Sequence, residues 1–267
     1  MRLRGQRVLV TGASSGIGEA CARAFAGEGC HLLLVARRRD RIDELARQCR
    51  EVHGVDVLPA AIDVRDRTAV ESWIDALESG WRDIDVLVNN AGLARGLAPL
   101  HEGNVEDWDE MIDTNLKGLL YVTRSVLRGM VARGRGHVIN IGSIAGHESY
   151  LGGNVYCATK RAVTGLTRAL AIDTLGSGVR VSSVDPGLVD TEFSDVRFHG
   201  DRGRARSVYQ GLRPLGADDV AEAVMFCATR PPHANVREMV LLSADQAGSV
   251  HVHREPSGGG DDSRGQI

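Results

Sequence analysis

The chain has 267 residues, of which 43% are hydrophobic and 25% are charged, as expected for a globular protein with one large domain or two small ones. The formal net charge of −3 does not predict nucleic acid or an anionic membrane as a partner. The only apolar run among the first twelve residues is too short for a signal-peptide core or a membrane span, so we expect a cytoplasmic protein.

Short apolar runs alternate with longer amphipathic segments along the chain. The runs that predict strands cover residues 7–12, 31–36, 57–63, 84–92, 136–143, 179–187 and 237–242. The predicted helices begin at Ile17 and cover about 41–52, 105–133, 154–175 and 218–229, with one more between the third and fourth strands. The strands are continuously apolar, as in strands buried on both faces. This order predicts an α/β fold: a single-domain, Rossmann-like, doubly wound parallel sheet with helices on both faces.

Two segments interrupt this alternation. Residues 190–216, which we call the cover segment, are polar and glycine-rich, and loops of this length inside a compact domain are usually functional. Residues 255–267 contain glycine and charge but almost no apolar residues, so we expect a disordered tail.

The cysteines and histidines give no metal pattern. There are five cysteines, an odd total without a C-x-x-C pair, which argues against a disulfide framework and a zinc site and predicts reduced, mostly buried thiols. His251 and His253 are close in sequence, but no Cys or carboxylate lies at ligand spacing. We therefore expect no bound metal.

A glycine-rich stretch, TGASSGIG, follows the first predicted strand and opens the first helix. Its glycines are Gly12, Gly16 and Gly18, and they allow a pyrophosphate to approach the amides and positive end of the helix. The spacing G-x-x-x-G-x-G differs from the commoner G-x-G-x-x-G, and an ordinary glycine-rich turn is the alternative. Its place between strand and helix favours nucleotide binding.

The end of the second strand indicates which nucleotide. NAD-binding folds usually present an acidic residue there, whereas this chain has Ala36 followed by Arg37 and Arg38. Guanidinium groups can hold a 2′-phosphate bidentately, so these residues favour NADP, with Ser14 as a further donor. A solvated basic helix start, or NAD with Asp40 nearby, remains the alternative.

Three other patterns lie where ligands would approach. Asp63 and Val64 end the third strand near the expected adenine position, although an aspartate there can equally cap a helix. NNAG at residues 89–92 suits a backbone that passes close to a ligand, or a tight turn. Tyr156 and Lys160 in YCATK are four residues apart, on one face of the predicted helix. An ammonium beside a phenol makes a possible acid/base pair, although so short a pattern also recurs by chance.

Together these motifs resemble the short-chain dehydrogenases/reductases over residues 5 to about 245, because TGASSGIG, NNAG, YCATK and the pair Pro186 and Gly187 occur in that family's order. GGNVYCATK and DPGLVDTEFSDVRFHGD are similar to the NADP-dependent 3-hydroxy acid dehydrogenases that oxidise serine and L-allo-threonine. Bacterial carbonyl and aldehyde reductases share the same motifs. Residues 240–254 run longer than the hydroxy-acid branch pattern, which keeps the substrate open.

The resemblance implies roles for individual residues. Tyr156 would exchange a proton with the substrate oxygen, Ser143 would hydrogen-bond that oxygen, and Asn115 would bind a water connected to Lys160. Lys160 and the cationic nicotinamide would favour the phenolate. Thr191 would touch the nicotinamide carboxamide. The implied cofactor-binding residues are Gly12, Ser14, Ser15, Gly16, Ile17, Gly18, Arg37, Arg38, Asp63, Val64, Asn90, Ala91, Gly92, Tyr156, Lys160, Pro186, Gly187, Val189 and Thr191.

The substrate side of the expected site is less defined. A hydroxy acid needs a cation for its carboxylate, and Arg95 and Arg197 are candidates unless they are merely solubilising. His147 and Tyr150 would line the pocket wall or cap the loop, and Cys157 would be a packing residue. The family domain would cover residues 1–250, with the cover segment over substrate and nicotinamide.

The expected function is NADP-dependent hydride transfer involving a small 3-hydroxy acid, with a general carbonyl reductase and a non-catalytic NADP sensor as alternatives. A sensor would not need Ser143, Tyr156 and Lys160 together. By analogy with the family we also expect a homotetramer, because the helices at 105–133 and 154–175 carry apolar residues on more than one face. These residues include Leu119, Leu120, Val163 and Leu166.

Overall fold

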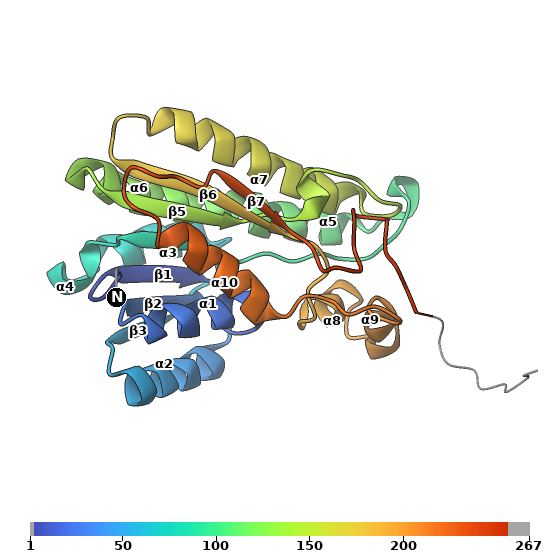
Figure 1. The fold of residues 1–267 in the computed structure, drawn as a ribbon, viewed down its shortest axis with the longest axis horizontal. Coiled ribbons are helices and arrows are strands. Elements are labelled where there is room, and N and C mark those ends of the chain that lie inside the picture. The colour runs from blue at the N-terminus through green and yellow to red at the C-terminus, as the bar shows by residue number, and fades with distance from the viewer. Residues whose placement is uncertain (1–2, 256–267) are drawn as a thin grey trace, which may run out of the picture.

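The computed structural model describes residues 3–255, which form one parallel sheet between two layers of helices (Figure 1). The sheet has seven strands in these residues, in the order β3-β2-β1-β4-β5-β6-β7. The strands are β1 (Arg7–Thr11), β2 (His31–Ala36), β3 (Val57–Ala61), β4 (Val86–Asn89), β5 (Gly136–Ile141), β6 (Val179–Pro186) and β7 (Glu238–Leu241). The strand order reverses between β1 and β4, where α/β folds usually bind their ligands.

The helices lie on both faces of this sheet. They are α1 (Gly16–Gly27), α2 (Arg39–His53), α3 (Arg67–Asp75), α4 (Ser79–Arg82), α5 (Val105–Ile112), α6 (Leu119–Arg133), α7 (Asn154–Asp173), α8 (Phe193–Arg197), α9 (Arg202–Ser207) and α10 (Ala217–Ala228). Two 3₁₀ turns, η1 (Leu100–Glu102) and η3 (Ile144–Gly146), and one π-helical turn, η2 (Asp113–Gly118), complete the elements. The predicted doubly wound α/β fold is confirmed.

Alternate side chains of each central strand enter different cores. Val8 and Val10 of β1 lie in the core under α1, α2 and α10, whereas Leu9 lies in the core under α3 and α6. All three are fully buried, as the two-sided burial of a parallel sheet requires. The helix layers hold the strand ends in fixed positions, so the loops that leave these ends have rigid supports.

One predicted helix is interrupted. Residues 105–133 form α5 and α6 with the π-helical turn η2 between them. Such turns insert an extra residue into a helix and occur often at functional sites. Here the turn contains Asn115, which is buried.

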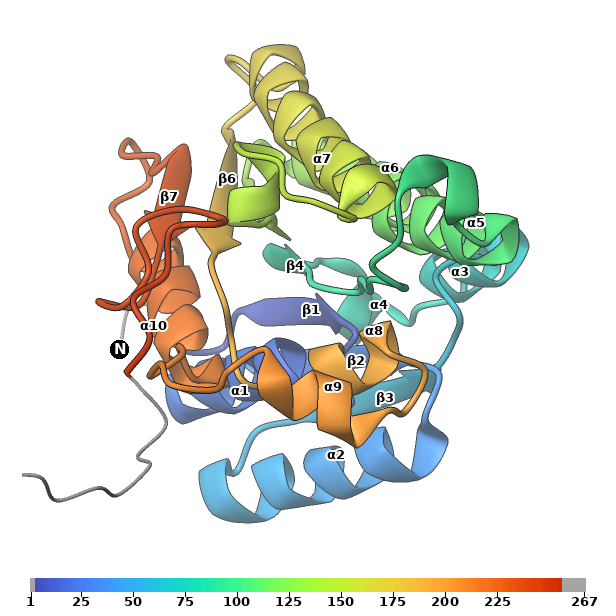
Figure 2. The ribbon, with the colours of Figure 1, turned by 90° about the vertical axis from the view of Figure 1, so that its right-hand side faces the viewer.

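The cover segment is also more ordered than a plain loop, because it contains α8 and α9. In Figure 1 these helices, α5 and the chain after β7 lie together at the right-hand end of the sheet, the end that faces the viewer in Figure 2. This is the end at which the parallel strands finish. The tail predicted to be disordered falls, from residue 256 on, outside the described residues.

The five cysteines, Cys21, Cys30, Cys49, Cys157 and Cys227, are all buried and unpaired, as expected. Burial raises the pKa of the Cys21 thiol to about 12, which makes it unreactive at neutral pH. No helix in residues 3–255 is long and apolar enough to span a membrane.

The residues expected to support a tetramer differ in exposure, and Leu166 on α7 is partly buried. Leu119 and Val163 are buried inside the chain, with 7% and 1% exposure, so they give no support. Leu120 on α6 is 40% exposed and Ile172 on α7 is 74% exposed. The apolar surface available for a partner therefore differs from the one that the helical pattern indicates, and it includes Ile172, which the pattern did not single out.

Candidate active site

A cavity of about 740 Å³ opens at the ends of the strands. Most of the predicted site residues line it: Gly12, Ser14, Ser15, Gly16, Ile17, Arg37, Arg38, Asp63, Val64, Asn90, Ala91, Gly92, Ser143, Tyr156, Lys160, Pro186, Gly187, Val189 and Thr191. Gly18 and Asn115 are not among the lining residues, and neither is Asp40. The cavity therefore joins the glycine-rich loop, the β2 end, the Tyr156 region and the cover segment in one site.

The glycine-rich loop has the backbone shape that its sequence predicts. Gly12 and Gly16 have φ values of +65° and +55°, which residues with a Cβ atom rarely adopt. Gly18 serves a different purpose, because a Cβ atom there would lie 2.4 Å from the Gly12 carbonyl oxygen. The absence of that side chain lets α1 begin against the loop. Gly18 therefore has a packing role, and its predicted contact with the cofactor stays a prediction.

The NNAG segment is bonded to the glycine-rich loop. Asn90 Nδ2 donates to the Thr11 carbonyl at 3.0 Å and to the Gly12 carbonyl at 3.2 Å, and the Ala91 amide donates to Thr11 Oγ1 at 3.0 Å. Thr11 was missed as a site residue, because a threonine at the end of an apolar strand looks like any β-branched residue. These bonds fix the two loops as one floor of the cavity.

The basic end of β2 makes a network that the sequence does not reveal. Arg38 donates from Nε to Ser14 Oγ at 3.1 Å, from Nη2 to Ser15 Oγ at 2.5 Å, and from Nη1 to Glu192 Oε2 at 2.7 Å. Arg41 Nη1 donates to the other Glu192 oxygen at 2.6 Å. Partial burial raises the pKa of Glu192, but these hydrogen bonds outweigh it and lower the pKa to about 2. Glu192 is therefore ionised and held by two guanidinium groups.

Tyr156, Ser143 and Lys160 come together beside the ends of β4 and β5. All three are buried, with 9%, 7% and 7% exposure. Lys160 Nζ donates to the Ile141 carbonyl at 2.9 Å and lies 6.0 Å from the centre of the Tyr156 ring. Burial raises the pKa of Tyr156, while Arg197 and the Ser143 hydroxyl act in the opposite direction. Burial lowers the pKa of Lys160 to about 8, although the negative charge of Asp185 acts to raise it.

The expected joint effect of Lys160 and the cationic nicotinamide on the Tyr156 phenol stays a prediction. In this structure the pKa of Tyr156 is raised. The physical reason is burial, which disfavours the phenolate and the ammonium alike. A further positive charge next to the phenol is required before it ionises near neutral pH.

Replacing Lys160 by Met should stabilise the unliganded protein at pH 7 by about 1–3 kcal/mol, because the buried ammonium is no longer desolvated. The pKa of Lys160 falls from its ordinary 10.5 to about 8 on folding. Between these values the unfolded chain holds a proton that the native protein has released, so the wild type gains stability as pH rises. The difference between variant and wild type should therefore shrink from pH 7 to pH 10 in urea unfolding. A variant no more stable at pH 7 would contradict this.

Asn115 lies in the π-helical turn and is bonded entirely within the protein. Its Oδ1 accepts from the Leu93 amide at 2.8 Å, and its Nδ2 donates to the Leu93 carbonyl at 2.8 Å and to Thr159 Oγ1 at 3.1 Å. A Cβ atom on Gly92 would be 3.2 Å from Asn115 Oδ1 and 3.6 Å from Lys160 Nζ, so the three residues are neighbours. The water between Asn115 and Lys160 stays a prediction.

The two arginine candidates for the substrate carboxylate differ in their partners and in whether they line the cavity. Arg95 donates to Glu110 Oε2 at 2.8 Å and to the Val196 carbonyl at 2.6 Å, and it does not line the cavity. Arg197 lines the cavity, with its guanidinium carbon 5.1 Å from the centre of the Tyr156 ring. Its Nη2 donates to the Tyr150 hydroxyl at 2.7 Å, while its buried Nε has no partner in residues 3–255.

Arg197 also has no carboxylate partner in the part of the chain that the structure describes. A buried, unpaired guanidinium nitrogen is costly unless a ligand accepts from it, and a carboxylate is its best acceptor. Of the two predicted wall residues, Tyr150 lines the cavity and His147 does not. The geometry favours a ligand that carries an anionic group next to Tyr156.

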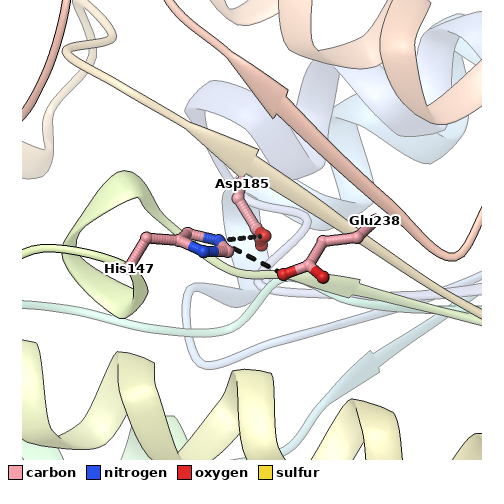
Figure 3. A group of neighbouring side chains, drawn as sticks. All are labelled: His147, Asp185 and Glu238. Carbon is pink, nitrogen blue, oxygen red and sulfur yellow. Dashed lines mark hydrogen bonds and ion pairs between the residues drawn. The ribbon is translucent and has the colours of Figure 1, made fainter.

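His147 belongs to a network behind the cavity (Figure 3). Its Nε2 lies 2.7 Å from Asp185 Oδ2 and 3.5 Å from Glu238 Oε1, and Arg168 Nη2 lies 3.0 Å from the same Glu238 oxygen. Asp185 is completely buried, and burial raises its pKa although Ser183 and His147 hydrogen-bond to it. A Cβ atom on Gly142 would be 1.8 Å from Asp185 Oδ1. This network places a carboxylate against the end of β5, near Lys160.

The ligand atoms of His147, Asp185 and Glu238 lie within 4.8 Å of one another, close enough for a metal ion. Arg168 already neutralises Glu238, however, and the imidazole is hydrogen-bonded to Asp185. These contacts satisfy the three side chains without a metal. We assign a network of hydrogen bonds around the Arg168–Glu238 ion pair, and the absence of a metal stays a prediction.

Comparisons with known proteins agree with this arrangement. A family model described as short chain dehydrogenase matches residues 6–201. The NADP-dependent 3-hydroxy acid dehydrogenase YdfG of Salmonella typhi is 49% identical over 249 residues, which are 92% of this chain and 99% of that protein. The NADP-dependent 3-hydroxy acid dehydrogenase of Schizosaccharomyces pombe is 42% identical over 255 residues, 95% of this chain and 98% of that protein.

Solved structures give the same result. The closed form of a serine dehydrogenase complexed with NADP+ has a TM-score of 0.88 and 46% identity, and covers 94% of this chain and 100% of its own. An alcohol dehydrogenase from Thermococcus sibiricus, complexed with 5-hydroxy-NADP, has a TM-score of 0.80 and 31% identity over 91% of this chain and 98% of its own. The predicted family is thereby confirmed, and the chain belongs to the short-chain dehydrogenase family.

Proposed function

We propose that this protein is an NADP-dependent dehydrogenase that transfers a hydride between the cofactor and a small 3-hydroxy acid. The observation that carries the substrate class is Arg197, a cation beside Tyr156 whose buried Nε lacks a partner among the described residues. The relatives named as 3-hydroxy acid dehydrogenases support the same class. A small hydroxy acid would give Arg197 a carboxylate and Tyr156 a hydroxyl.

The cavity fits NADP on its own residues. Gly12 and Gly16, with positive φ, shape a loop at the start of α1 that suits a pyrophosphate. The β2 end offers the Arg37 and Arg38 guanidinium groups and the Ser14 hydroxyl, and its last residue is Ala36, not a carboxylate. A 2′-phosphate therefore meets positive charge there. When bound, NADP supplies the hydride chemistry.

The protein residues would handle the proton and the orientation. Arg197 would hold the substrate carboxylate, which brings the 3-hydroxyl to Tyr156 Oη and Ser143 Oγ. Tyr156 would take the hydroxyl proton during oxidation and return it during reduction. Ser143 would stabilise the negative charge that develops on the oxygen. Lys160, close to its pKa of about 8, would relay the proton away from Tyr156.

The direct test is NADP+ reduction, followed by absorbance of the reduced cofactor, with serine, L-allo-threonine and 3-hydroxypropionate. Turnover with any of these, and weaker turnover when the carboxylate is replaced by an amide, is the expected result. No turnover with the three acids, together with NADPH-dependent reduction of uncharged aldehydes, would establish the carbonyl reductase instead. Binding of NADPH without any turnover would indicate the sensor.

The assembly and location belong to the same proposal. We propose one functional domain over residues 1–250 with the cover segment at 190–216, acting as a cytoplasmic homotetramer. The exposed Leu120 and Ile172 support an interface on α6 and α7. Light scattering of the purified protein would measure the mass directly, and a monomer would exclude the tetramer.

A further inference from the structure

We propose that Glu192 competes with the 2′-phosphate of NADP for Arg38, so that the position of the cover segment depends on whether this phosphate is present. The proposal rests on the NADP dependence proposed above. It adds a residue that shapes selectivity for NADP over NAD and that links the adenosine end of the cavity to its substrate end.

The contacts of Arg38 are the first support. Each of its three guanidinium nitrogens has a partner: Nε has Ser14, Nη2 has Ser15, and Nη1 has Glu192 at 2.7 Å. Serine hydroxyls can turn to donate to a phosphate as readily as they accept from an arginine. The Glu192 carboxylate cannot, because an ionised carboxylate only accepts. Among the described residues, Glu192 is thus the partner of Arg38 whose negative charge a phosphate would repel.

The repulsion between the 2′-phosphate and Glu192 follows from their charges. A phosphate monoester carries close to two negative charges at neutral pH, and it would share one guanidinium with an ionised carboxylate. Arg41 offers Glu192 a second partner, since its Nη1 donates to the other Glu192 oxygen at 2.6 Å. Glu192 can leave Arg38 without becoming unpaired. The side chains of Arg38, Arg41 and Glu192 are 43%, 50% and 40% exposed, so each ion pair is weak enough to exchange.

The position of Glu192 in the chain links its contact with Arg38 to the substrate end of the cavity. Glu192 directly follows Thr191, whose Cγ2 would lie 3.1 Å from a Cβ atom on Gly16. It directly precedes α8, which ends at Arg197, the cation beside Tyr156. A shift of Glu192 away from Arg38 therefore moves the segment that positions Arg197. NAD, which lacks the phosphate, would leave the Glu192 contact in place.

The test uses two matched probes, 2′,5′-ADP and 5′-AMP, which differ by the 2′-phosphate. Calorimetry on wild type and Glu192→Gln should give about three- to fivefold tighter 2′,5′-ADP binding by the variant, the value of an exposed ion pair, with 5′-AMP unchanged. Asp195→Asn is the control, because it removes a charge from the same segment at a side chain with no hydrogen bond or ion pair in residues 3–255. It should leave 2′,5′-ADP binding within about twofold, the effect of a solvent-screened charge that does not contact Arg38.

Hydrogen exchange gives a second measurement, which would not change if Glu192 only stabilised the local structure. In the wild type, 2′,5′-ADP should speed amide exchange in residues 191–207 relative to 5′-AMP, and the difference should vanish in Glu192→Gln. Weaker 2′,5′-ADP binding by Glu192→Gln would mean that the carboxylate clamps Arg38 onto the phosphate, and it overturns the proposal. Equal tightening by Asp195→Asn also overturns it. If wild type binds both probes equally, the NADP assignment itself fails, which separates the two proposals.

Discussion

The Tyr156→Phe variant should oxidise hydroxy acids about 10³- to 10⁴-fold more slowly than wild type, at the upper end of what a general acid/base contributes. Phenylalanine keeps the ring that packs against Phe193 at 5.6 Å between centroids but removes the proton acceptor. Because oxidation needs the phenolate and burial raises the pKa of Tyr156, wild-type kcat/KM for oxidation should rise with pH above neutrality. The variant should lose this rise. Steady-state NADP+ reduction from pH 6 to 10 measures both effects.

Two controls show whether Tyr156→Phe loses activity because the proton acceptor is gone or because the site no longer folds correctly. The affinity of Tyr156→Phe for 2′,5′-ADP should stay within about twofold of wild type, since that probe occupies the Arg38 end of the cavity. Tyr121→Phe is a matched variant on α6 outside the cavity, and it should keep wild-type rates. If Tyr156→Phe kept more than a tenth of the wild-type rate, another group would have to transfer the proton.

Replacing Arg197 by Met should lower kcat/KM for hydroxy acids by about 10²-fold, the value of charge-assisted hydrogen bonds to a buried carboxylate. Turnover of uncharged alcohols and aldehydes should fall much less. A smaller loss common to all substrates is expected near neutral pH, because Arg197 lowers the pKa of Tyr156 and the variant lacks this effect. That common part should disappear at alkaline pH, whereas the loss specific to acids should persist.

Arg197→Lys and Arg95→Met complete the comparison. Lysine keeps the charge without the planar pair of donors, so it should restore only part of the activity on acids. Arg95 binds Glu110 outside the cavity, so its replacement should not distinguish acids from uncharged substrates. An equal loss of activity on both substrate classes in Arg197→Met, at every pH, would contradict a carboxylate contact.

The sequence predicts much of this fold because its signals are local. Alternating apolar runs and helical segments determine the sheet, and the glycine-rich loop, Arg37 and Arg38 follow strands whose ends are easily placed. The pairing of Tyr156 with Lys160 depends only on helical spacing. The π-helical turn at residues 113–118 had no such signal, since one short turn leaves no periodicity to detect.

The remaining features depend on contacts between distant segments. Arg38 and Glu192 are 154 positions apart, and nothing near either residue indicates that they meet. Arg95 and Arg197 are equally plausible cations in sequence. Only the fold shows that Arg95 binds Glu110, whereas Arg197 has no carboxylate partner in residues 3–255. The raised pKa of Tyr156 follows from burial, which spacing along a helix cannot reveal.

The buried cysteines make the protein a convenient background for site-specific labelling. None of the five thiols is on the surface, and the proposed chemistry uses none of them. An Arg202→Cys variant would place one exposed cysteine in the cover segment, which should react with a maleimide dye ahead of the native thiols. Fluorescence from that dye would report the movement of this segment in real time, and all five native cysteines could be kept.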